Sequence, residues 1–109
     1  MWIFSKLGFF SIVQDFTSPD VLHVRTRFAG DLERALAACG LTAEITVSPD
    51  ADYRYRTKLS RDDLLKLLGV LGESLDYPNF KNEVAKDPAQ RARLSAYHEV
   101  WHTLQALQR

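Results

Sequence analysis

A four-residue pattern recurs in this chain and constrains its fold more than any other feature of the sequence. Arg25–Phe28 (RTRF) resembles Arg56–Leu59 (RTKL), and a leucine-bearing helical run follows each copy. Asp31 in the first run corresponds to Asp62 in the second, and a strand-like run precedes each copy. The order of elements therefore predicts two units of strand, strand and helix within one chain.

Alternation of apolar and polar residues marks the expected strands, because side chains of a strand point to opposite faces in turn. The predicted strands are Phe9–Asp15, Val21–Phe28, Glu44–Ser48 and Tyr53–Leu59, and the predicted helices lie near 31–39 and 61–75. Two units paired side by side would close one core between a sheet and its helices. We expect a single α+β domain over 1–109, with a four-stranded, mainly antiparallel sheet and helices on one face. The repeat units, about 9–40 and 43–75, would be related by approximate two-fold symmetry, and a helical tail would occupy 77–109.

The same periodicities predict a core and two helix starts. Residues expected to be largely buried are Phe10, Ile12, Val24, Phe28, Leu36, Ile45, Val47, Tyr55, Leu64, Leu68, Leu71 and Trp101. Ser60 followed by Asp63 resembles a capping box at the start of the second helix. Asp87 followed by Pro88 favours the start of a long C-terminal helix, with Asp as the N-cap residue.

Charge and cysteine content exclude some classes of protein. Fourteen basic and fourteen acidic residues cancel, so no global field draws the chain to nucleic acid or to an anionic membrane. The single Cys39 cannot form an internal disulfide, which favours a reducing compartment. The apolar N-terminus lacks the basic segment and the cleavage site of a signal peptide, and no stretch is long enough to span a membrane. We expect a cytoplasmic protein without a membrane partner.

One catalytic motif is present, His98-Glu99-Val100-Trp101-His102, which fits the HExxH pattern of zinc hydrolases on a predicted helix. In such a site His98 and His102 would bind zinc and Glu99 would act as the base. No His, Asp, Glu or Cys follows His102 to serve as a downstream third ligand. A helix packed on the sheet, with both histidines at its polar edge, explains the motif better, and we expect no cofactor.

A second candidate site is a basic surface on the sheet. If the apolar residues of the two central strands face the helices, six basic residues share the opposite face. They are His23, Arg25, Arg27, Arg54, Arg56 and Lys58. Arginine suits phosphate and carboxylate recognition, and a basic sheet face can hold single-stranded nucleic acid. Phe9 or Phe10 would supply a stacking ring.

Other interpretations of this basic surface stay open. The arginines would equally be solvated, or paired with acids of the tail such as Glu83, Asp87 and Glu99. A protein partner with an acidic surface would satisfy the same charges. The sequence contains no Gly-rich phosphate loop, nucleophile elbow or cysteine cluster.

Four segments carry a resemblance to a known family: Met1–Phe4, Gly8–Val13, Asp76–Lys81 and Tyr97–Trp101. Through these segments the whole chain resembles a family of small, uncharacterised bacterial proteins. That family has no assigned activity, so the resemblance implies a bacterial cytoplasmic origin and adds no catalytic residue. The leading hypothesis is a small non-enzymatic binding protein that uses the basic sheet face, and the alternative is a zinc-dependent hydrolase.

Overall fold

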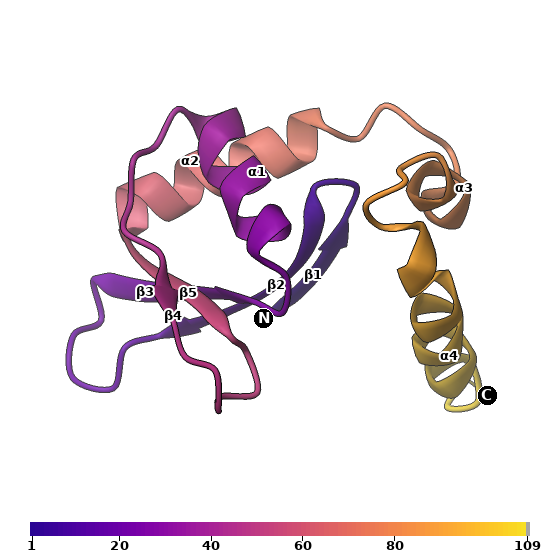
Figure 1. The fold of residues 1–109 in the computed structure, drawn as a ribbon, viewed down its shortest axis with the longest axis horizontal. Coiled ribbons are helices and arrows are strands. Elements are labelled where there is room, and N and C mark those ends of the chain that lie inside the picture. Colours follow the sequence, from indigo (N-terminus) through magenta and orange to yellow (C-terminus); the bar gives the residue numbers. More distant parts are fainter. Residues whose placement is uncertain (109) are drawn as a thin grey trace. The chain divides into compact units, whose positions relative to one another are not determined.

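The computed structural model describes residues 1–108 and divides into two compact units, one from Met1 to Asp76 and the other from Tyr77 onward. The strands of the first unit are β1 (Trp2–Ser5), β2 (Gly8–Gln14), β3 (Val21–Thr26), β4 (Thr46–Val47) and β5 (Tyr55–Ser60), and its helices are α1 (Ala29–Cys39) and α2 (Arg61–Glu73). The second unit holds α3 (Phe80–Ala85), a short 3₁₀ turn (Arg91–Arg93) and α4 (Leu94–Gln105). Figure 1 shows these elements. The expectation of a single domain over 1–109 stays a prediction.

The five strands form one antiparallel sheet in the order β1-β2-β3-β5-β4. The α+β class and the antiparallel pairing are therefore confirmed, but the prediction of four strands is wrong. The additional strand is β1, which pairs Ser5 with Gly8 across a two-residue turn. Its four residues are too short a run for alternation to distinguish a strand from an apolar terminus.

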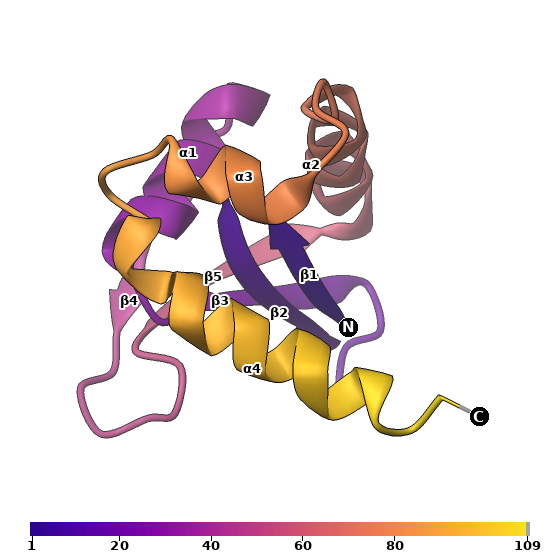
Figure 2. The same cartoon turned by 90° about the vertical axis from the view of Figure 1, so that its right-hand side faces the viewer.

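The helices α1 and α2 cover one face of the sheet, as Figure 2 shows from the side. Side chains that alternate along the strands supply the buried core beneath them, including Phe10, Val24 and Leu59. Ser60 caps α2, since its hydroxyl accepts the Asp63 N–H at 3.1 Å, and this confirms the predicted capping interaction. The sheet and its two helices thus form a two-layer unit.

Three residues of the predicted core are exposed instead: Phe28 (51%), Val47 (55%) and Trp101 (48%). Phe28 follows the end of β3 and is the N-cap residue of α1, so strand alternation no longer applies to it. Val47 belongs to the two-residue edge strand β4, and α4 contains no buried residue. Three further predicted residues, Ile45, Tyr55 and Leu68, are only partly buried, and the others are buried.

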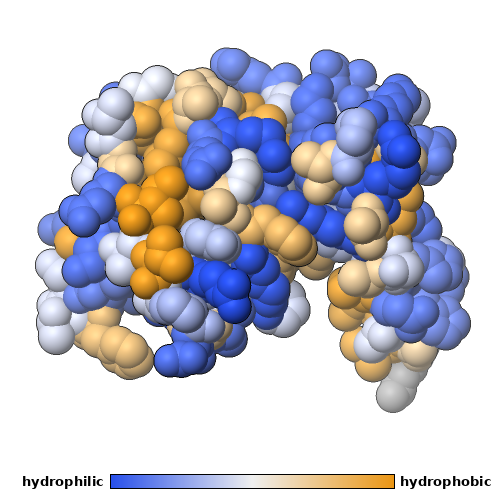
Figure 3. All heavy atoms as spheres, in the orientation of Figure 1, coloured by the Kyte–Doolittle hydropathy of each residue, from blue (hydrophilic) through white to orange (hydrophobic). Residues whose placement is uncertain are grey.

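Over residues 77–108 the buried side chains of the second unit are Val84 and Gln90. The Asp87 carboxylate accepts the N–H of Ala89 in a turn, so the predicted helix start at this point is wrong and α4 begins only at Leu94. Figure 3 shows hydrophobic side chains along one side of α4. Among the described residues, no helix combines the length and the hydropathy needed to cross a membrane.

Candidate binding surface on the open sheet face

The sheet face opposite α1 and α2, here called the open face, carries no helix within residues 1–76. The register of β3 and β5 places Arg25 directly opposite Arg56 and His23 directly opposite Lys58. These four predicted site residues therefore share one surface, in two adjacent rows. Like charges directly opposite each other destabilise a sheet, so the pairing of Arg25 with Arg56 costs stability unless other groups offset it.

The other two predicted site residues lie just outside the strands. Arg27 follows β3, and its guanidinium carbon lies 4.1 Å from the ring centre of Tyr53 and 5.6 Å from that of Phe9. Arg54 precedes β5 and is exposed. Arg27 thus belongs to the open face through its ring contacts.

Aromatic rings accompany the arginines on this face. Phe9 lies 4.4 Å from Phe4, 6.1 Å from Trp2 and 6.4 Å from Tyr53, measured between ring centres. These four residues, Trp2, Phe4, Phe9 and Tyr53, are called the aromatic cluster below. Arg25 also stacks on it, 4.7 Å from the centre of the Tyr53 ring. Stacked guanidinium groups are attracted to the faces of aromatic rings, which helps to offset the repulsion between the arginines.

Sequence reasoning identified only part of this cluster. Phe9 was one of two candidates for a stacking ring, and the other, Phe10, is completely buried beneath the helices. Trp2 and Phe4 were missed because β1 was not predicted, and burial along β1 does not alternate but rises from the exposed Trp2 to the buried Ser5. Tyr53 is 4% exposed, but Arg25, Arg27 and Phe9 enclose it instead of the helices.

Carboxylates pair with two of the basic residues. Asp15 contacts Nε2 of His23 at 2.7 Å, and Asp52 contacts Arg56 at 3.4 Å. The hydrogen bond with His23, followed by those with Thr17, lowers the pKa of Asp15 from 3.8 to about 2. Because the carboxylate is ionised at neutral pH, it accepts the bond and the imidazole Nε2 donates.

The remaining basic residues of the surface have no acidic partner among residues 1–108. Among the described residues, Arg25, Arg27, Arg54 and Lys58 form no ion pair. Arg25 instead donates to the hydroxyl of Ser11 at 2.6 Å. The predicted pairing with acids of the tail stays a prediction, and Glu83 itself pairs with Lys86 at 3.2 Å. The open face therefore carries an excess of positive charge in a chain of zero net charge.

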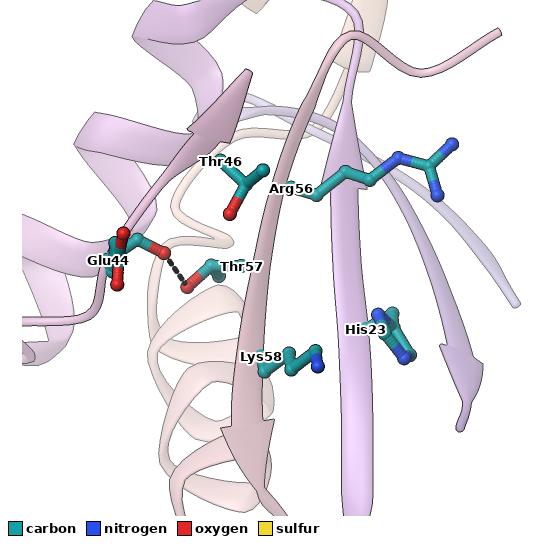
Figure 4. A pocket seen from close by; sticks show the side chains of 6 residues that line it. All are labelled: His23, Glu44, Thr46, Arg56, Thr57 and Lys58. Carbon is teal, nitrogen blue, oxygen red and sulfur yellow. Dashed lines mark hydrogen bonds between the residues drawn. The ribbon is translucent and has the colours of Figure 1, made fainter. Parts of the chain in front are cut away.

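A shallow hollow of about 350 Å³ lies at the start of the short strand β4, beside β5. Its lining residues are His23, Glu44, Thr46, Arg56, Thr57 and Lys58 (Figure 4). Thr57 donates its hydroxyl to the main-chain oxygen of Glu44 at 2.8 Å, which holds the segment before β4 against β5. The hollow thus joins three predicted basic residues to the acidic residue Glu44.

The HExxH motif lies on α4, as predicted, but its surroundings differ from those of a metal site. Nδ1 of His98 lies 3.3 Å from the ammonium nitrogen of Lys81, and its ring stacks on Trp101 at 5.4 Å. An ammonium group only donates hydrogen bonds, so Nδ1 is the acceptor in this contact. Among the described residues, no three His, Cys, Asp or Glu side chains are placed to hold a metal ion together. His98 thus has a cation as its near neighbour.

Comparisons with models of protein families, with curated proteins and with solved structures find no match to this chain.

Proposed function

We propose that this protein binds single-stranded nucleic acid through the open face of its sheet. The observation that carries the proposal is the stacking of Arg25 and Arg27 on the aromatic cluster. Proteins that bind single strands combine cations that follow the phosphates with rings on which bases stack. Both components occur here on one surface that no helix of the same unit covers.

The exposed rings favour nucleic acid over an acidic protein as the partner. Trp2 is 68% exposed at the edge of the aromatic cluster, where its indole is accessible to a flat ligand. A base stacks on such a ring whatever its identity, and a guanidinium plane provides a second stacking surface. An acidic protein surface would satisfy the cations but would leave this indole without a matching group.

Binding of labelled oligonucleotides of about 12 nucleotides, measured by fluorescence anisotropy at several salt concentrations, tests the proposal. The test variant is Arg27→Gln with Lys58→Gln, which removes two unpaired cations from the open face. We expect weaker binding to unrelated sequences, and a salt dependence whose logarithmic slope falls by roughly 1.4, because each phosphate contact on a single strand contributes about 0.7.

The matched control is Lys66→Gln with Lys86→Gln, which removes the same charge from α2 and from the second unit. We expect this variant to bind as the wild type does. Equal weakening in both double variants would indicate a nonspecific charge effect and would contradict the proposal. No binding by the wild type, together with saturable binding of one acidic protein, would replace nucleic acid by a protein partner.

A further inference from the structure

The hollow beside β4 has two sides of opposite character. Figure 4 shows His23 and Lys58 on one side of β5 and Glu44 on the other. Lys58 is exposed and forms no ion pair among the described residues, so its ammonium group is available to an anion. The guanidinium of Arg56 donates to Asp52 and to the carbonyl of Tyr53, so only the aliphatic stem of Arg56 contributes to the lining of the hollow.

Glu44 is held in place by its main chain, which leaves its carboxylate available to a ligand. The buried Thr57 donates to the Glu44 carbonyl, and Thr46 pairs with Arg56 two residues further along. The Glu44 side chain is exposed and forms no ion pair with any residue in the described part of the chain. A carboxylate at this position repels a phosphate but accepts hydrogen bonds from hydroxyl groups.

A ligand that suits both sides must carry an anion at one end and a hydroxyl donor at the other. A ribonucleotide has this form, since its phosphate and its ribose 2′-hydroxyl lie on one sugar. A volume of about 350 Å³ falls within the usual range of small-molecule sites. We propose that the hollow holds one ribonucleotide of the bound strand, with its phosphate at Lys58 and its 2′-hydroxyl donating to Glu44. This inference rests on the proposed function and adds a preference for RNA over DNA.

Oligouridine and oligodeoxyuridine of equal length test the preference, because they differ only in the 2′-hydroxyl group. A hydrogen bond to a charged group supports roughly 10-fold tighter binding of the ribose strand by the wild type. In the Glu44→Ala variant the ratio should fall to about 2-fold or less on the same basis. The Glu73→Ala variant, which removes an exposed acid from α2, should keep the wild-type ratio.

A third strand with 2′-O-methyl uridine sharpens the test, because methylation removes the hydroxyl donor and keeps the oxygen. We expect it to bind like the deoxy strand. Equal binding of all three strands by the wild type would overturn the inference and leave the proposed function intact. A ratio of ribose to deoxyribose binding that is unchanged in Glu44→Ala would do the same. Failure of every strand to bind would overturn the proposed function and this inference with it.

Discussion

The two faces of the sheet are built from the same strands, and neighbouring residues along each strand point to opposite faces with different surroundings. On the helix-covered face Phe10 and Val24 are completely buried. One position away, on the open face, Phe9 and Arg25 meet around the ring of Tyr53. The burial of a side chain on this sheet therefore depends on which groups cover its face. The covered face is closed by helices, and the open face closes part of its own apolar surface with arginines.

The open face therefore has its own small set of stabilising contacts. Cation–π contacts at exposed sites stabilise by about 0.5–1 kcal/mol each, which is far less than a fully buried aromatic ring contributes. A surface held together in this way can exchange its own stacking partners for those of a ligand at low cost. Stability should reside mainly on the covered face and binding mainly on the open face.

The largest difference between the faces should appear when adjacent phenylalanines are truncated. Phe10→Ala leaves a cavity in the core and should lower the free energy of unfolding by about 3–5 kcal/mol, as measured by urea denaturation. Phe9→Ala removes a partly exposed ring and should cost about 1 kcal/mol. Equal losses for the two variants would break the distinction between the faces.

The next largest effect concerns Gly8, which begins β2 after the turn from β1. Gly8 has a φ of 147°, and a Cβ atom there would overlap the carboxyl group of the buried Asp31. That carboxylate accepts the N–H of Phe9 at 3.0 Å and contacts Arg34 at 2.6 Å, so it ties the turn between β1 and β2 to α1. Gly8→Ala should lower the free energy of unfolding by about 1–3 kcal/mol.

A helical glycine provides the control for this substitution. A Cβ atom at Gly72 in α2 meets no atom within 4 Å, and alanine is the better helix former. Gly72→Ala should therefore raise the free energy of unfolding by up to about 1 kcal/mol. A Gly8→Ala variant as stable as the wild type in thermal melts would show that the turn adjusts without strain.

Trp101 extends the comparison to α4, in which no residue is buried. Its ring is half exposed and touches His98 and the ammonium group of Lys81. Trp101→Ala should cost about 1 kcal/mol or less, in place of the larger loss that an enclosed ring would give. Chemical denaturation followed by circular dichroism measures the change. A loss as large as that of Phe10→Ala would indicate that the ring is enclosed in solution.

The smallest expected effect is a pH dependence on the open face. Asp15 has a folded-state pKa of about 2, below its usual 3.8, so its contact with His23 stabilises the fold above pH 3.8. This contribution is lost as the pH falls through 3.8 toward 2. The melting temperature of Asp15→Asn should lie below that of the wild type at pH 5, and the gap should close near pH 2. A difference in melting temperature that stays constant over this pH range would show that the effect does not come from ionisation of Asp15.

The predictable parts of this protein are those governed by local patterns. Helices α1 and α2 were placed within about two residues at each end, because apolar periodicity and caps such as Ser60 are local signals. The basic surface was found by the same alternation, which assigns His23 and Arg25 to one face. One edge of the sheet was not predictable, since β1 is too short to show a period, whereas the strand predicted at Glu44–Ser48 forms the other edge but only over the two residues of β4.

By itself the sequence determined the α+β class, the two central strands and the side of each strand on which the arginines lie. Period-two alternation is a property of consecutive residues, so it needs no knowledge of distant parts of the chain. Only the tertiary structure decided that Arg25 lies opposite Arg56, that β1 brings Trp2 and Phe4 beside Phe9, and that Tyr53 folds onto the open face. Strand register and the path of the loop between β4 and β5 arise from contacts between segments far apart in the sequence. The alternation along one strand carries no information about which neighbour it will meet.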